Sequence, residues 1–289
     1  EPLDRNPEIT MGKRILWVNT VGWREYDDPI AAILARVKEP DTEVEVVSLA
    51  MSEPLTHVEY HAYEALTFPG IVRLAADAGR RGLDAMVIGC FYDHALKEAR
   101  EVSGEMVVMA PCLAGVQLAS TLADTFSIIA TRRKCAAQMA ERVRSYGGGD
   151  RLASLRSLGI GVEQLQAKPA VTMQRIKEEA RRAVDEDGAE AIILGCTVEF
   201  GFHEEVQADL GVPVIDAVCN PFKLAEHLAG LKQQFRWVPS RVHGCEAPPA
   251  GEIDRFGLFK QLPPVGNRVL VQAADHLADR TANAVAGGA

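Results

Sequence analysis

The sequence predicts an α/β protein built from two similar lobes, each with a parallel sheet covered by helices. Short apolar runs alternate with segments that have helical apolar spacing, which is typical of parallel sheets with helices on both faces. Two segments also copy each other, 84–93 (DAMVIGCFYD) and 190–199 (EAIILGCTVE). The repeat predicts two Rossmann-like lobes related by a pseudo-twofold axis, with an active site in the cleft between them.

The first strand is the apolar run 14–19 (RILWVN), and residues 30–37 have the spacing of the helix that follows it. The next apolar run predicts a strand at 44–49, and a helix is expected over 71–80, just past Pro69-Gly70. The repeated strand at 86–88, a helix from about 93 to 102 and a strand at 106–109 complete this half.

A similar order restarts at the apolar run 126–130 (FSIIA), which predicts the first strand of the second lobe. The remaining elements of this half are predicted from the same two spacings: strands at 152–158, 192–194 and 212–215, and helices at 136–144, 171–184 and 199–210. Residues 219–232 form a helix that is expected to pack back on one lobe.

The character of the chain changes after Gln233. Residues 237–251 are rich in proline with few periodic apolar positions, and they predict an extended arm. Residues 267–285 carry apolar side chains at helical spacing (Val269, Leu270, Ala273 and Leu277) and predict a final helix. This extension, 233–289, is either a packing extension or an arm that contacts a second copy or partly covers the cleft.

Composition narrows the classes of partner. Charged residues at 25% and apolar residues at 47% are typical of a globular chain, and a formal charge of −9 disfavours nucleic acid and anionic membranes. No apolar stretch approaches the roughly 20 residues of a membrane helix. The polar first ten residues, with two prolines, predict no secretory signal. Six cysteines without a CxxC spacing predict a reduced, cytoplasmic protein. No HExxH, GxGxxG or phosphate-binding loop occurs, so neither a metal nor another cofactor is expected.

The two matched cysteines are the candidate catalytic residues. Cys90 and Cys196 each follow a predicted strand and precede a predicted helix, and parallel sheets bind ligands at this end of their strands. Unpaired N–H groups at a helix start stabilise a thiolate. Two equivalent thiols across a cleft could add and remove protons on opposite faces of one carbon. The alternative is a small core side chain, which is the expected role of the unmatched Cys112, Cys135, Cys219 and Cys245.

Six further residues are predicted to contact a small-molecule substrate: Asn19, His61, Phe91, Tyr92, Thr131 and Thr197. Asn19 and Thr131 end the first strands of the two lobes and should face the cleft. Backbone N–H groups at 91–92 and 197–198 are candidates for contacts with a developing oxyanion. The Thr197 hydroxyl is either such a contact or a helix N-cap. His61 lies before a helix, where a cleft wall and a surface loop are both open.

At these residues the chain resembles the aspartate/glutamate racemase superfamily, and within it the hydantoin and allantoin racemase branch. The matching elements are the strand ending in Asn19-Thr20, the segment 89–93 (GCFYD) and the segment 194–197 (LGCT), within a similarity over roughly 13–232. The resemblance implies proton transfer between two cysteines without pyridoxal phosphate or metal. It also implies one lobe made of 13–111 plus 218–232 and a second lobe of 112–217.

Departures from the family pattern bear on the substrate. Glutamate racemases look like D-S-G after the first strand, with Asn-Thr after the first cysteine and histidine two residues after the second. This chain has Asn19-Thr20-Val21-Gly22, Phe91-Tyr92 and Val198 at those places. A less polar, aromatic pocket fits a more acidic carbon, such as C5 of a hydantoin ring. The hydantoin branch usually shows Asn-Pro-Asn after the first strand, which is absent here, and His94 stands where proline is expected.

Other activities remain open on the same scaffold. Arylmalonate-type decarboxylases keep a cysteine in only one lobe, whereas maleate-type cis–trans isomerases keep both and use one as a covalent nucleophile. A binding module with a retired site is expected to have lost one cysteine or its glycine, and this chain retains both pairs. We expect a homo-oligomer.

Overall fold

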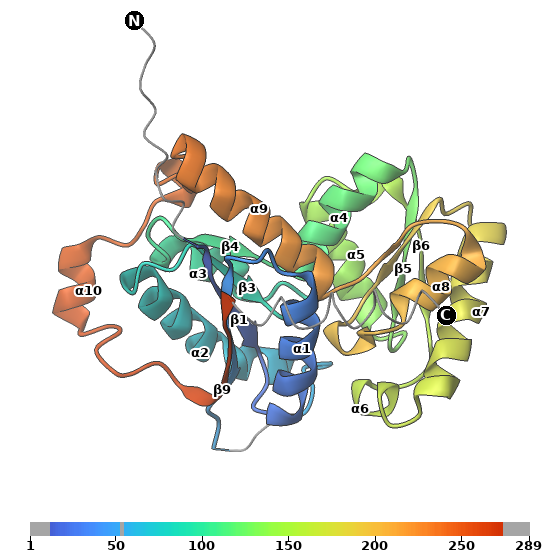
Figure 1. Cartoon of the computed structure of the whole chain (residues 1–289), viewed down its shortest axis with the longest axis horizontal. Helices are drawn as coiled ribbons and strands as arrows, with labels where there is room; N and C mark the ends of the chain where they lie inside the picture. Colours follow the sequence, from blue (N-terminus) through green and yellow to red (C-terminus); the bar gives the residue numbers. More distant parts are fainter. Residues whose placement is uncertain (1–11, 53–54, 274–289) are drawn as a thin grey trace, which may run out of the picture.

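The computed structural model describes residues 12–52 and 55–273, which form two α/β lobes side by side (Figure 1). The sheet of lobe I has the order β4-β3-β1-β2-β9, and the sheet of lobe II has the order β6-β5-β7-β8. All pairs are parallel except β2 with β9. The strands are β1 (Arg14–Asn19), β2 (Glu43–Leu49), β3 (Ala85–Ile88), β4 (Val107–Met109), β5 (Phe126–Ala130), β6 (Leu152–Ser157), β7 (Ala191–Leu194), β8 (Val214–Ile215) and β9 (Val265–Val271).

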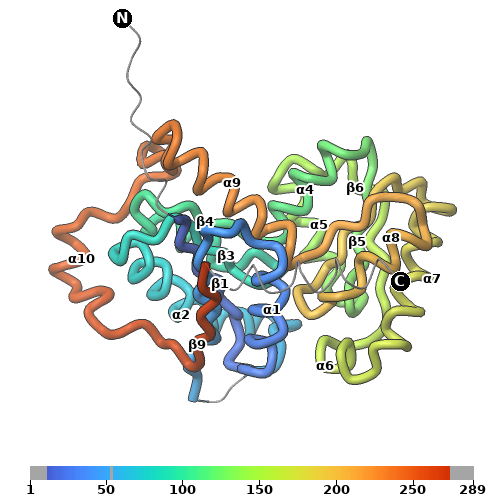
Figure 2. Tube along the Cα trace, in the orientation of Figure 1, coloured from blue at the N-terminus to red at the C-terminus, as the bar shows by residue number. Residues whose placement is uncertain are grey.

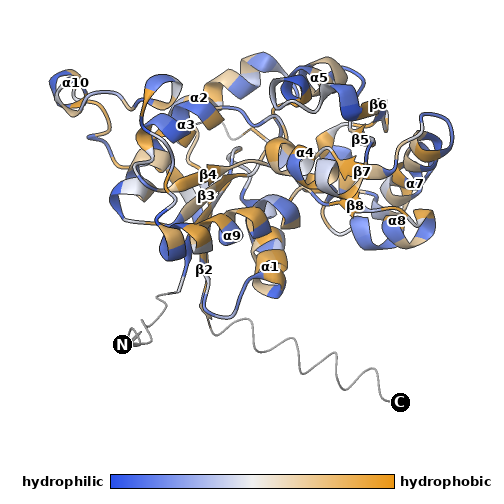
Figure 3. Ribbon diagram, turned by 90° about the horizontal axis from the view of Figure 1, so that it is seen from above, coloured by the Kyte–Doolittle hydropathy of each residue, from blue (hydrophilic) through white to orange (hydrophobic). Residues whose placement is uncertain are grey.

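Helices cover both faces of each sheet (Figure 3). The α-helices are α1 (Asp27–Val37), α2 (His61–Arg80), α3 (Leu96–Val102), α4 (Pro111–Leu122), α5 (Cys135–Ser145), α6 (Val162–Leu165), α7 (Pro169–Asp185), α8 (His203–Leu210), α9 (Cys219–Phe235) and α10 (Ala250–Phe256). Alternate residues of β1 serve opposite cores: Leu16 packs with the cluster under α2 and α3, and Trp17 packs with the cluster under α1 and α9.

The sequence repeat is also a repeat in space. In lobe I, β3 pairs with β1, and Gly89 donates its N–H to the carbonyl of Val18 at 2.8 Å. In lobe II, β7 pairs with β5, and Gly195 donates to Ile129 at 2.8 Å. A Cβ atom at either glycine would lie within 2.8 Å of that backbone oxygen. The close strand approach therefore requires glycine before each cysteine.

The predicted helix starts after the cysteines are wrong. Residue Cys90 is followed by a turn, and α3 begins only at Leu96. A single 3₁₀ turn, η3 (Thr197–Glu199), follows Cys196, and α8 begins at His203. The helices were predicted to begin too early because the apolar residues of these turns are also buried, so they continue the helical pattern in the sequence. Helix α4, an apolar segment that packs against α9, α5 and β7, was not predicted.

The predicted C-terminal helix is a second correction. Residues 265–271 form β9, which pairs antiparallel with β2 at the edge of the lobe I sheet. Exposed and less exposed side chains alternate along β9, which is the two-residue period of a strand. The same apolar positions also fit a helical spacing, and the helix was predicted for that reason. The remainder of that prediction, including Leu277, lies outside the described residues.

The arm between α9 and β9 runs along the outer side of lobe I (Figure 2). The arm contains α10. Arg241 of the arm contacts the end of α3, where its guanidinium donates a hydrogen bond to the carbonyl of Arg100 at 2.6 Å. Helix α9 packs on the lobe I sheet through Phe222, Ala225 and Ala229. The exact lobe boundaries stay a prediction.

Over residues 12–52 and 55–273, no helix has the length and apolar character to cross a bilayer.

Candidate active site

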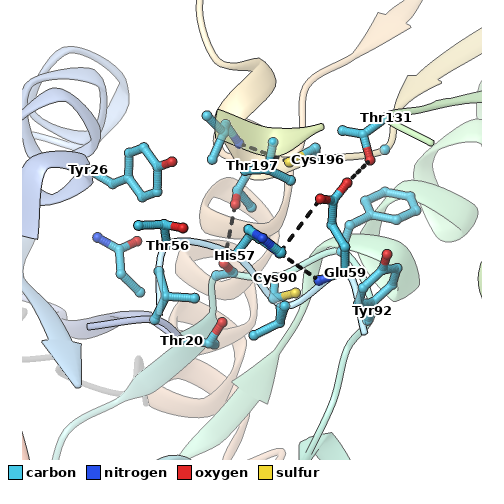
Figure 4. Close-up of a pocket in the computed structure, with 18 of the residues that line it drawn as sticks. Thr20, Tyr26, Thr56, His57, Glu59, Cys90, Tyr92, Thr131, Cys196 and Thr197 are labelled. Carbon is cyan, nitrogen blue, oxygen red and sulfur yellow. Dashed lines mark hydrogen bonds and ion pairs between the residues drawn. The ribbon is translucent and has the colours of Figure 1, made fainter. Parts of the chain in front are cut away.

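A cavity lies at the junction of the two lobes, and both repeated cysteines line it (Figure 4). Lobe I contributes the end of β1, the loop before α2 and the turn after β3. Lobe II contributes the residues after β5 and β7. The lining residues are Asn19, Thr20, Val21, Tyr26, Ile30, Thr56, His57, Val58, Glu59, Gly89, Cys90, Phe91, Tyr92, Thr131, Met139, Val162, Gly195, Cys196, Thr197 and Val198. Five of the six predicted substrate contacts are among them.

Cys90 sits in a turn whose backbone partners face its sulfur. The backbone N–H of Tyr92 and the hydroxyl of Thr20 both favour the charged form of the thiol. Thr20 was not predicted, although strand register would have found it. Counted from the glycine contacts at Val18 and Ile129, Thr20 occupies the position in lobe I that Thr131 occupies in lobe II.

Cys196 occupies the matching position in lobe II. Its sulfur accepts a hydrogen bond from the backbone N–H of Val198 at 3.4 Å, so the predicted donor at 198 faces the sulfur. The neighbouring Thr197 donates its hydroxyl to the carbonyl of Gly89 at 3.3 Å, across the cleft. Thr197 therefore ties the two cysteine turns to each other.

The expected stabilisation of a thiolate by backbone N–H groups is present at both cysteines, but burial outweighs it. Burial raises the pKa of Cys90 to about 12, against the smaller opposing effects of Tyr92 and Thr20. Burial also raises the pKa of Cys196 well above its ordinary value, and Glu199 and Cys90 add to the rise. No α-helix begins at either sulfur, and desolvation therefore dominates. Both groups are thiols at neutral pH.

Aromatic and aliphatic side chains form much of the cavity wall. Phe91 and Tyr92 are buried in it, and Tyr26 of the 3₁₀ turn before α1 joins them. Burial raises the pKa of Tyr26 to about 12, so its phenol stays a hydrogen-bond donor. Asn19 also lines the cavity, but its amide is already bound: it accepts from the indole N–H of Trp17 at 2.8 Å and donates to Asp27.

The predicted contact His61 lies outside this cavity, which is a correction. Its side chain is 71% exposed, and it pairs with Glu64 at 3.3 Å on the surface of α2. His57, four residues earlier, lines the cavity instead. The loop before α2 runs along the cleft, whereas the helix itself turns its first residue outward. A loop has no periodicity from which this difference could be predicted.

Glu59 extends from the same loop to lobe II. One carboxylate oxygen, Oε1, accepts the hydroxyl of Thr131 at 3.2 Å and lies 3.3 Å from Nε of Arg132. A second bridge between the lobes joins Thr56 to Glu163 at 2.5 Å. In Figure 4, His57 and Glu59 are drawn between the two cysteines. The loop 55–60 is thus a wall of the site that is tied to the opposite lobe.

The acids three residues after each cysteine have different surroundings. Asp93 accepts the backbone N–H groups of Cys112 and Leu113 at 2.9 and 2.8 Å, and so caps the start of α4. Burial raises its pKa to about 7. Glu199 is fully buried, and burial raises its pKa well above the ordinary value.

Within the described ranges, no group of three or more His, Cys, Asp or Glu side chains is arranged to hold a metal ion. The titratable side chains that line the cavity are those of the two cysteines, His57, Tyr26, Tyr92 and Glu59. Two matched thiols in a shared, partly apolar cavity between like lobes are the arrangement that the family resemblance implied for a two-lobed α/β racemase.

Comparison with known proteins supports this class. Residues 24–219 match the Asp/Glu/Hydantoin racemase family. The chain is 32% identical over 217 residues to a hydantoin racemase of Pseudomonas sp. (strain NS671), which covers 75% of this chain and 86% of that one. The chain belongs to the Asp/Glu/Hydantoin racemase family and is an enzyme of the racemase type.

Two solved structures show the same architecture. An allantoin racemase from Klebsiella pneumoniae superposes with a TM-score of 0.76 at 27% identity, covering 82% of this chain and 94% of that one. An allantoin racemase from Pseudomonas fluorescens superposes with a TM-score of 0.68 at 25% identity, covering 81% and 97%. The predicted fold class and family branch are confirmed.

Proposed function

We propose that the protein is a cofactor-independent racemase that uses Cys90 and Cys196 as base and acid on a carbon next to a carbonyl. The observation that carries this proposal is that the two cysteines of the repeat line one cavity, each at the end of an equivalent strand. The proposed substrate is a hydantoin-like cyclic amide.

Each turnover moves two protons at the same carbon. The thiolate of one cysteine removes the proton from one face. The electron pair of that C–H bond forms a C=C bond, and the π pair of the carbonyl moves onto its oxygen, which gives an enolate. The thiol of the other cysteine then protonates the opposite face, which restores the carbonyl and leaves that second cysteine as thiolate. The reverse direction exchanges the two roles. The active form therefore has one thiol and one thiolate, and it is a minor form at neutral pH because both pKa values are raised.

The substrate class follows from the acidity of the carbon and from the relatives. The positions next to the cysteines hold Phe91-Tyr92 and Val198 in place of the polar residues that glutamate racemases carry there, and C5 of a hydantoin is more acidic than the α-carbon of a free amino acid. Relatives named for hydantoin and allantoin racemisation support a cyclic ureide over a free amino acid.

Proton exchange in D₂O tests the proposal. Purified protein is incubated with 5-substituted hydantoins, allantoin and free amino acids, and loss of the proton signal at the stereocentre is followed by NMR together with optical rotation. We expect exchange and racemisation of a cyclic ureide. A decarboxylase would release CO₂, and a cis–trans isomerase would act on an alkene without labelling a stereocentre.

Single substitutions at the two cysteines test the mechanism. Cys90→Ser and Cys196→Ser should each abolish racemisation, because a serine hydroxyl is a poor base and a weak acid. Each variant should still label one enantiomer, and the two variants should label opposite ones. The exposed Cys245 provides the matched control, Cys245→Ser, which should keep full activity. Racemisation at the wild-type rate by either Cys90→Ser or Cys196→Ser would contradict the two-cysteine mechanism.

A homo-oligomer and a cytoplasmic location remain predictions that rest on the sequence alone.

A further inference from the structure

The carboxylate of Glu59 is satisfied on one side only. Its side chain is 2% exposed, and Oε1 has two partners from lobe II, Thr131 and Arg132. The second oxygen, Oε2, has no hydrogen-bond donor among the described residues. A buried carboxylate oxygen without a donor is costly, and such groups in native proteins call for an explanation.

His57 does not supply the missing hydrogen bond. Its Nδ1 atom lies 3.6 Å from Oε2, which is beyond hydrogen-bond distance. The same Nδ1 atom faces the backbone N–H of Glu59 at 3.4 Å and therefore acts as an acceptor. In a neutral imidazole the proton is then on Nε2, so the ring turns a lone pair, and not an N–H, toward this region.

We propose that Oε2 of Glu59 accepts a hydrogen bond from a ring N–H of the substrate. The proposal rests on the proposed function and narrows it, because Glu59 lines the cavity that holds both cysteines. A cyclic ureide carries N–H groups next to its carbonyls and so presents the donor that this oxygen lacks. The same oxygen repels a substrate carboxylate, which disfavours free amino acids and malonates in this site.

A purely structural role accounts for only half of the side chain. Glu59 joins the loop 55–60 of lobe I to lobe II. Elsewhere in the interface, Gln138 of α5 makes a similar link, because its Nε2 donates to Oε2 of Glu64 on α2 at 2.7 Å. That role uses Oε1 and leaves Oε2 unexplained. If Glu59 only links the two lobes, the effect of replacing it on binding should not depend on whether the ligand carries its ring N–H groups.

Replacement by glutamine separates these readings. Arg132 and Thr131 both face Oε1, so the amide of Glu59→Gln is held with its oxygen toward them. The NH₂ group then takes the place of Oε2 and opposes a ring N–H donor to donor. Gln138→Leu is the matched control, since it breaks a bond between the lobes without changing the cavity lining.

Binding is measured by calorimetry with 5,5-dimethylhydantoin and its N1-methyl and N3-methyl derivatives. These probes have no C5 proton, so their affinity does not depend on turnover. Glu59→Gln should weaken binding of the parent about 10- to 100-fold, and Gln138→Leu should leave it within about twofold. In the wild type, one N-methyl derivative should bind at least about tenfold more weakly than the parent, and in Glu59→Gln that penalty should largely disappear.

The inference is overturned if methylation costs the same factor in both proteins, since that penalty is steric, or if Glu59→Gln binds the parent as tightly as the wild type. Should Glu59→Gln not fold, Glu59→Asp, which withdraws the carboxylate by one methylene, must show the same loss of discrimination. Wild-type exchange of a hydantoin proton in D₂O keeps the two proposals apart. If the wild type exchanges the proton but the N-methyl penalty does not depend on Glu59, only the Glu59 contact is refuted. If the wild type neither binds nor exchanges a hydantoin, the proposed function is refuted as well.

Discussion

His94 is a buried base whose replacement should change the pH dependence of stability. The side chain is fully buried and stacks on Phe68, with ring centroids 5.7 Å apart. The Thr67 hydroxyl donates to the carbonyl of Glu64 at 2.8 Å, so at 3.1 Å it accepts from Nε2 of His94. Nδ1 has no partner among the described residues. Burial, with a smaller effect of Arg142, lowers the pKa of His94 to about 3.

The size of the effect follows from the two pKa values. In the unfolded chain this histidine binds a proton below its ordinary pKa of 6.5, whereas in the folded protein it does not bind one until about pH 3. Stability is therefore lost as pH falls below 6.5. The unfolded chain takes up this proton over the roughly 1.5 pH units from pH 6.5 to pH 5. Between about pH 7.5 and pH 5 the free energy of unfolding therefore falls by about 2 kcal/mol.

His94→Leu removes this linkage while keeping the stacking volume. Urea unfolding of the wild type and the variant, followed by tryptophan fluorescence at the two pH values, gives the difference directly. Asp93, whose pKa is raised to about 7, titrates in the same range with the opposite sign, but it is present in both proteins and cancels. If the variant loses as much stability as the wild type between these pH values, His94 is not held neutral in the fold.

Two further outcomes are expected. Gly89→Ala should lower the free energy of unfolding by about 1–3 kcal/mol and reduce turnover, because its methyl would lie 2.8 Å from the carbonyl of Val18. Gly244→Ala, whose methyl meets nothing within 4 Å, is the control, and equal thermal midpoints for the two variants would contradict this reasoning. The kcat/KM of the wild type should rise about tenfold per pH unit from about pH 7 to pH 9, since the base is a thiol with a raised pKa. A flat profile over that range would mean that a thiolate is already present.

Local patterns were sufficient for the elements that create the cleft. The strands before Cys90 and Cys196 are short apolar runs that end in a glycine, and both features are visible without knowing what packs on them. The repeat then placed the cysteines at equivalent strand ends, and five of the six predicted contacts line the cavity. The edge strand β9 was mistaken for a helix because its apolar positions fit both periods, and only the open edge of β2 decides between them.

The sequence by itself determined two like lobes with a cysteine at the end of one strand in each, because strand periodicity and the need for glycine are properties of a few adjacent residues. The tertiary structure decided the chemistry around those cysteines. Burial raises the thiol pKa values, and burial depends on every element around the cleft. Glu59 meets Thr131, 72 residues away, and His57 rather than His61 faces the cavity. Contacts between distant residues and the direction of a loop side chain have no local signature, since they are set by how the two lobes pack.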